Sequence, residues 1–129
     1  MKKGYSAEYD AKKKLMEQYG KYSVVKTAIG QNAPDYIVFT SKAFEIEFAT
    51  PPMNDFESIT MVKGIEIKST QTKKYYPHEH DIKQVLFLEK WQETTNVPVE
   101  YYVRTIVNHK VVWEEFTLEA FKERYVKTT

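Results

Sequence analysis

The stretch VKGIEIKST, residues 62–70, alternates isoleucine with glutamate and lysine. In an extended strand successive side chains point to opposite faces, so Ile65 and Ile67 share one face and Glu66 and Lys68 the other. The isoleucine face is suited to a buried core. The charged face fits either solvated surface or the start of a catalytic site, and such a short pattern alone favours solvated surface.

The segments around this strand have the pattern of an α/β domain. A helix is expected over residues 6–19, with Ser6 as its N-cap and Gly20 as its terminator. The further expected elements are strands at 22–28 and 35–41, a candidate additional strand at 43–49, a proline-containing loop at 51–55, a strand at 61–69, a helix at 80–95, strands at 99–107 and 110–116 joined by a turn at Asn108-His109, and a helix at 118–125 capped by Thr117. The order αβββαββα predicts a mixed β-sheet flanked by helices.

Length and composition limit the classes of protein that this chain can represent. Its 129 residues suit a single domain over residues 1–129, and 42% hydrophobic with 29% charged residues is typical of a globular chain. The absence of cysteine excludes disulfides, thiolate nucleophiles and cysteine-ligated zinc. No apolar run approaches the roughly 20 residues that span a bilayer, and the N-terminal residues lack the apolar stretch of a signal peptide. We therefore expect a cytoplasmic protein with no membrane contact.

Charge is distributed unevenly along the chain, although its formal sum is only +1. Residues 1–28 carry seven lysines and three acidic residues, seven minus three giving +4, whereas residues 35–57 carry five acidic residues and one lysine, giving −4. Lys73 and Lys74 follow the opening strand. Basic segments are suited to phosphate contacts, although lysine runs on helices are also ordinary solvated faces.

Asp35 and Glu66 are candidate ligands of a divalent metal ion. Asp35 follows Pro34 at the start of one strand and Glu66 lies on a neighbouring strand, so two carboxylates would repel unless a cation lay between them. Mg²⁺ accepts one or two carboxylates plus water and phosphate oxygens, and the main-chain carbonyl of Ile67 could join them. Mn²⁺ is expected to substitute. Lys68 could then orient the attacking water and offset charge that develops on phosphorus.

Two helical residues are candidates for the same site. On the first helix Glu8 shares a face with Leu15, which we expect to turn inward, so that Glu8 reaches the metal, a water bound to it, or a lysine. An ion pair between Glu8 and Lys12 on an exposed helix face is the alternative. On the second helix Gln84 shares a side with Trp91, where its amide could position water or a phosphate.

This set of residues resembles the PD-(D/E)xK nuclease superfamily, and within it the archaeal-type Holliday junction resolvases, including versions carried by archaeal viruses. The resemblance runs through most of the chain. The matching positions are Glu8 in the first helix, Lys26 ending a strand, the Pro34-Asp35 motif, Glu66-x-Lys68 in the opening stretch, the tyrosine-bearing segment KKYY at 73–76, and Gln84 in the following helix.

The resemblance implies a restriction-endonuclease-like fold and a homodimeric, Mg²⁺-dependent endodeoxyribonuclease that makes paired cuts in four-way DNA junctions during recombination and repair. The stretch between Asp35 and Glu66 is longer than is usual in the family. Two other functions stay open from the residues alone. One is a nuclease for flaps, nicks or duplex ends, and the other is a catalytically silent DNA-binding or interaction module of the same fold.

The resemblance also leads us to expect a DNA-binding surface and a dimer contact. The residues expected at the DNA are Lys12, Lys13, Lys26, Lys73 and Lys74, together with Tyr75, which could stack on a base or instead pack within the protein. The dimer contact is expected at the second helix and at the 99–116 hairpin. These segments carry more aromatic residues than we expect one small core to bury, namely Phe87, Trp91, Tyr101, Tyr102 and Trp113.

Overall fold

The computed structural model of the protein describes residues 3–27, 33–45 and 56–126. In chain order its elements are α1 (Lys3–Tyr19), a single 3-10 turn η1 (Lys21–Ser23), β1 (Val24–Lys26), β2 (Tyr36–Glu45), β3 (Phe56–Ser69), α2 (Glu79–Thr95), β4 (Val99–Val107), β5 (Lys110–Thr117) and α3 (Leu118–Tyr125). The predicted order of helices and strands is confirmed.

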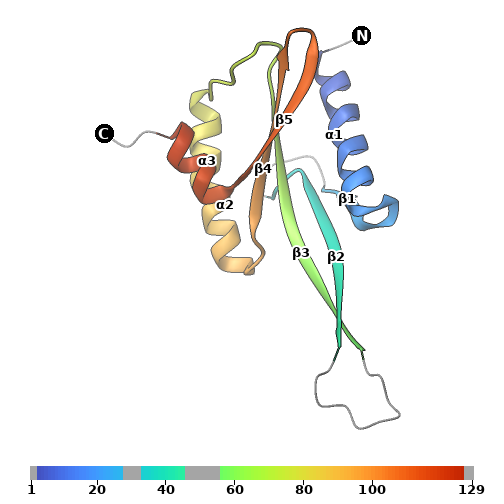
Figure 1. Ribbon diagram of the computed structural model, residues 1–129. Coiled ribbons are helices and arrows are strands. Elements are labelled where there is room, and N and C mark those ends of the chain that lie inside the picture. Colours follow the sequence, from blue (N-terminus) through green and yellow to red (C-terminus); the bar gives the residue numbers. More distant parts are fainter. Residues whose placement is uncertain (1–2, 28–32, 46–55, 127–129) are drawn as a thin grey trace.

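The five strands form one sheet in the order β1-β2-β3-β4-β5. β3 and β4 pair in parallel, which the α2 crossover between them permits, and the other pairs are antiparallel. Helix α1 covers one face of the sheet, and α2 and α3 cover the other (Figure 1). The predicted fold class, a mixed sheet flanked by helices, is confirmed.

Each face of the sheet has its own hydrophobic core. On the α1 face Leu15 packs with Tyr36, Val38, Ile65 and Tyr102, and the α2 and α3 face holds a second cluster that includes Tyr101 and Phe121. Tyr101 and Tyr102 point to opposite faces of the interior strand β4, which explains how both are fully buried. Trp91 and Trp113 also pack against these clusters. The inference that these four aromatic residues are surplus to the core was therefore wrong, whereas Phe87 is exposed.

Element boundaries differ from the expected ones at three places. Helix α1 begins at Lys3, so Ser6 lies within the helix and is not its N-cap. Of the candidate additional strand at 43–49, residues 43–45 continue β2 in unbroken antiparallel register with β3 as far as the Glu45–Phe56 pair, and residues 46–49 lie outside the described residues. β3 correspondingly starts at Phe56. The expected loop at 51–55 lies outside the described residues.

The predicted hairpin turn, the predicted cap of α3 and the predicted end of α1 are confirmed. Asn108 and His109 both have positive φ, 51° and 65°, as a two-residue hairpin turn between β4 and β5 requires. Thr117 caps α3 by accepting a hydrogen bond from the Ala120 amide. Gly20 ends α1 with a φ of 99°.

Within the described part of the chain, no helix is both long and apolar enough to cross a membrane.

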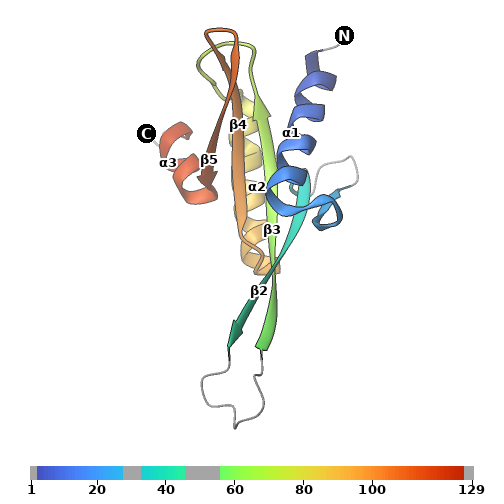
Figure 2. The same cartoon turned by 45° about the vertical axis from the view of Figure 1, so that its right-hand side comes forward.

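β2 and β3 extend beyond the rest of the sheet as a two-stranded arm. β1 pairs with β2 no further than Val38, and β4 pairs with β3 only from Gly64 onward. From these points to Glu45 and Phe56 the two strands pair with each other alone among the described residues, and the arm projects from the body of the domain (Figures 1 and 2). The functional residues expected on these strands lie at the other end, inside the sheet.

Candidate active site

Main-chain contacts fix Asp35 at the start of β2. The Thr27 amide donates to the carbonyl of Asp35 (3.0 Å), and the Thr27 hydroxyl donates to the carbonyl of Pro34 (2.6 Å). Since Tyr36 pairs with Ile65, the antiparallel register places Asp35 beside Glu66. Residues that are 31 positions apart in the sequence thus become neighbours through strand pairing.

The glycine in the opening stretch allows this approach. A Cβ atom at Gly64 would lie 2.5 Å from Cγ of Pro34 and 3.4 Å from the Trp91 ring. No real side chain tolerates the first distance, so the fully buried Pro34 can pack against β3 only because residue 64 has no side chain. Gly64 therefore helps to set the position of Asp35, the next residue after Pro34.

The two predicted metal-binding carboxylates lie side by side and share hydrogen bonds. The Asp35 amide donates to Oε1 of Glu66 (3.2 Å), and the Ile67 amide donates to Oδ2 of Asp35 (2.9 Å). Glu66 is only 2% exposed. Burial and then the charge of Asp35 raise the pKa of Glu66 to about 8, although Lys68 opposes the shift. The negative charge of Glu66 is therefore disfavoured in the metal-free protein, and a bound cation would stabilise it.

Lys68 lies on the same face as Glu66 and bridges β3 to α2. Its Nζ is 3.4 Å from Oε2 of Glu66 and 2.9 Å from Oδ1 of Asp81, and it donates to Oε1 of Gln84. The structure thus brings four of the predicted catalytic residues together: Asp35, Glu66, Lys68 and Gln84. Gln84 is placed by the first turns of α2, which cross the sheet face on which Glu66 and Lys68 lie.

Asp81 is a member of this cluster that the sequence interpretation missed as a site residue. Its position near the start of the helix expected at 80–95 already accounts for a carboxylate there, because a negative charge favours the helix dipole. The available signal was its position three residues before Gln84, which puts both side chains on one helix face. Burial alone would raise the pKa of Asp81, but hydrogen bonds from the His78 main chain and from Lys68 outweigh it and lower the pKa.

Glu8 occupies a different environment from the one expected. It is exposed and forms an ion pair with Lys26, not with Lys12. The inward face of α1 consists of Ala7, Ala11 and Leu15, so the expectation that Glu8 turns inward was wrong. The buried stripe follows a spacing of four residues, and Glu8 falls just beside it. Its participation in metal binding stays a prediction.

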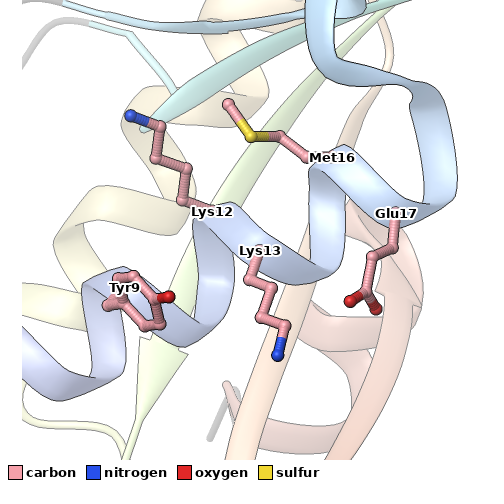
Figure 3. A pocket seen from close by; sticks show the side chains of 5 residues that line it. All are labelled: Tyr9, Lys12, Lys13, Met16 and Glu17. Atoms are coloured by element: carbon pink, nitrogen blue, oxygen red, sulfur yellow. The ribbon is translucent and has the colours of Figure 1, made fainter.

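The five predicted DNA-contacting lysines lie on three separate segments of the chain. Lys12 and Lys13 are exposed on α1 and line a surface hollow of about 420 Å³ together with Tyr9, Met16 and Glu17 (Figure 3). Lys26 is the last residue of β1 and is exposed. Lys73 and Lys74 are exposed in the loop between β3 and α2.

Tyr75 does not fit the base-stacking role considered for it. It is 8% exposed and packs edge-on against Tyr125, with ring centroids 5.4 Å apart. The alternative of packing within the protein is correct. The adjacent Tyr76 is 71% exposed and is the tyrosine of this segment that a ligand could reach.

The donor set at the site is compatible with Mg²⁺. No group of three or more His, Cys, Asp or Glu side chains suited to a metal occurs among the described residues. Mg²⁺ does not require one, because it is commonly held by one or two carboxylates and keeps several waters. The adjacent oxygens of Asp35 and Glu66 supply that minimum, and the carbonyl of Ile67 stays a predicted further ligand.

Comparisons with known proteins add a likeness of fold. No protein-family model matches the chain, and no curated protein matches its sequence. Among solved structures, the fold is similar to that of Hjc, a Holliday junction resolvase from the archaeal hyperthermophile Archaeoglobus fulgidus. The identity is 13%, the match covers 89% of this chain and 77% of the resolvase, and the TM-score is 0.49. A TM-score of 0.49 does not indicate a shared activity. The activity is therefore inferred from the side chains of the site alone.

Proposed function

We propose that this protein is a metal-dependent DNA endonuclease of the restriction-endonuclease-like class. The observation that carries the proposal is the convergence of Asp35, Glu66 and Lys68 at one point of the sheet. Their motif order resembles that of the PD-(D/E)xK nucleases, and strand pairing turns this order into a compact group of two carboxylates and one ammonium. Buried charges are costly, so a group of three at one place favours a functional site over a solvated surface.

The proposed chemistry is hydrolysis of a phosphodiester bond. Asp35 and Glu66 would hold Mg²⁺, which when bound supplies Lewis acidity at the phosphate and a more acidic water. Lys68 is 12% exposed, and oxygen atoms of Glu66, Asp81 and Gln84 surround its Nζ. Its ammonium would stabilise negative charge developing on the phosphoryl oxygens, and Gln84 would restrict where that ammonium lies.

The proposed substrate is a four-way DNA junction, cut by a homodimer in the cytoplasm. Two active sites related by a twofold axis would deliver paired cuts. Exposed apolar residues support a contact surface on the α2 side of the sheet. Val24 and Val38 pack on the α1 face, so the exposed Val25 and Phe39 point to the opposite face, the one that carries α2 with its exposed Phe87.

The proposal is tested with a panel of labelled DNA substrates. A four-way junction, a flap, a nicked duplex and an intact duplex are incubated with the protein in Mg²⁺, in Mn²⁺ and in chelator. Metal-dependent cleavage confined to the junction, as two symmetric cuts, is the expected result. Equal cleavage of flap or duplex would replace the junction by a general nuclease activity.

Absence of cleavage for every substrate and metal would overturn the proposal. In that case DNA binding without hydrolysis would favour the catalytically silent module. The variant Asp35→Asn serves as the control for contaminating nuclease, because it loses one metal-binding charge and little volume.

A further inference from the structure

The carboxylate of Asp81 connects the N-terminus of α2 to the lysine on β3. Its Oδ2 accepts a hydrogen bond from the His78 amide (2.9 Å), which is the N-cap residue of the helix. Its Oδ1 accepts from Nζ of Lys68 (2.9 Å). The two oxygens thus have different partners, and the residue is 5% exposed. A helix cap alone needs neither the second contact nor this burial.

The contacts of Lys68 fall into two kinds. Its ammonium has three N–H donors and three protein oxygens near them, from Glu66, Asp81 and Gln84. Glu66 is the most distant of the three, at 3.4 Å, and is also a proposed metal-binding residue. Asp81 and Gln84 have no place in the metal set, and both come from α2. The helix therefore supplies the contacts to Lys68 that do not depend on the metal.

We propose that Asp81 is a positioning residue that holds the Lys68 ammonium at the active site. The inference rests on the proposed nuclease function, because it assigns Asp81 a part in that reaction through Lys68. A long lysine side chain loses considerable rotamer freedom when fixed, and a charged hydrogen bond to an immobile carboxylate offsets that loss. Asp81 is immobile because the helix end holds its other oxygen. The Nε2 atom of exposed His80 also lies near the same Oδ1, at 3.2 Å.

The first measurement is the single-turnover cleavage rate of Asp81→Asn in saturating Mg²⁺. The asparagine oxygen can still accept from the His78 amide, so the helix cap is kept while the charge facing Lys68 is lost. We expect the chemical step to fall about 10–100-fold, as for residues that orient catalytic groups, with DNA affinity unchanged. Asp81→Glu should recover part of the rate. Glu79→Gln is the matched control, because it removes the same charge from the same helix turn at an exposed position.

A double-mutant cycle with Lys68→Ala separates positioning from a structural effect. If Asp81 acts through Lys68, Asp81→Asn should not lower the rate further once Lys68 is absent. Rate losses that multiply in the double variant would overturn the inference. So would an unchanged chemical step in Asp81→Asn.

A measurement without DNA distinguishes this inference from the proposed function. In ¹H–¹⁵N correlation spectra of the lysine ammonium groups, Lys68 should give a protected signal, assigned by its loss in Lys68→Ala. That signal should vanish in Asp81→Asn and persist in Glu79→Gln. A chain that cleaves no DNA would defeat the nuclease proposal, yet this spectrum would still report whether Asp81 fixes Lys68. An unchanged Lys68 signal in Asp81→Asn would overturn the inference even in an active nuclease.

Discussion

The amide of Asp35 donates a hydrogen bond to the Glu66 carboxylate, 3.2 Å from N to Oε1. The carboxylate of Asp35 in turn accepts from the amide of Ile67, next to Glu66. Each acidic side chain is therefore held by the backbone beside the other, within two paired strands. Such fixed oxygens need little reorganisation to receive a metal ion, and losing either one should affect chemistry more than folding.

Asp35→Asn and Glu66→Gln should each abolish metal-dependent cleavage. Each variant removes one metal-binding charge with almost no change in volume, so we expect a loss greater than the roughly 10–100-fold typical of orienting residues. Circular dichroism and junction binding in Ca²⁺ should match the wild type. Glu93→Gln, at an exposed position of α2, is the control and should cleave normally. Full activity of either site variant at saturating Mg²⁺ would remove that residue from the proposed site.

Lys68→Ala should lower the rate of the chemical step far more than the affinity for DNA. Its ammonium lies among Glu66, Asp81 and Gln84, where it can stabilise charge that develops during hydrolysis. Single-turnover rates at saturating enzyme and filter-binding affinities measure the two effects separately. If only affinity fell, Lys68 would be reassigned to ground-state phosphate contact.

The free energy of unfolding of the metal-free protein should fall as pH rises from about 4.5 to about 8, through the contribution of Glu66. The pKa of this residue is raised by burial from 4.5 to about 8 in the folded state. Across that window the folded chain keeps a proton that the unfolded chain has released, so increasing pH favours unfolding. Urea unfolding in chelator at several pH values measures the slope. The Glu66→Gln variant should lack this component; parallel curves for the two proteins would contradict the assignment.

Gly64→Ala should destabilise the fold and slow cleavage. The added methyl group would meet Pro34 at 2.5 Å, so the segment that leads into Asp35 has to shift. Overpacking of this kind costs about 1–3 kcal/mol, which urea unfolding can resolve. Combining it with Pro34→Ala removes the clashing ring atom and should cost less than the sum of the two single changes. Simple additivity would show that the two residues do not clash.

Phe87→Glu should shift a dimer to monomer in sedimentation equilibrium at micromolar concentration. Phe87 is 44% exposed on α2, and a charge there would oppose an apolar contact. Val111 is exposed on the β4–β5 hairpin, which is the other predicted contact region, and Val111→Glu tests that region in the same experiment. A wild-type chain that is monomeric with and without junction DNA would defeat the paired-cut proposal and leave a monomeric nuclease.

Sequence patterns predicted the part of the site that strands supply. The alternation in VKGIEIKST was enough to place Glu66 and Lys68 on one face, and the motif order was enough to pair them with Asp35. Glu8 was misplaced because its helix face was inferred from its spacing of seven to Leu15, whereas the buried stripe of α1 is the Ala7, Ala11 and Leu15 series. Spacing along one helix cannot decide which of two adjacent stripes meets the sheet.

Burial of aromatic residues was harder to predict for a different reason. The sequence does not show that β4 lies inside the sheet with helices over both faces, and this placement is what buries Tyr101 and Tyr102 on opposite faces. Asp81 was overlooked as a site residue because the helix dipole already accounts for a carboxylate near the start of a helix. Its second contact depends on where α2 lies over β3, which is a tertiary property that no local pattern encodes.

Because β3 extends into the arm that it forms with β2, it has two parts with different pairing partners. From Gly64 to Ser69, β3 pairs with β4, and at Gly64 and Ile65 it pairs with β2 as well, whereas from Phe56 to Lys63 it pairs only with β2 among the described residues. The first part lies in the body of the domain and the second in the arm (Figure 1), so amide protons should exchange with solvent progressively faster from Gly64 towards Phe56. Glu66 and Lys68 both lie in the part of β3 that pairs with β4. Changes in the sequence of the arm should thus leave the carboxylates of the candidate site undisturbed, so the arm can vary while the strand that carries Glu66 and Lys68 stays the same.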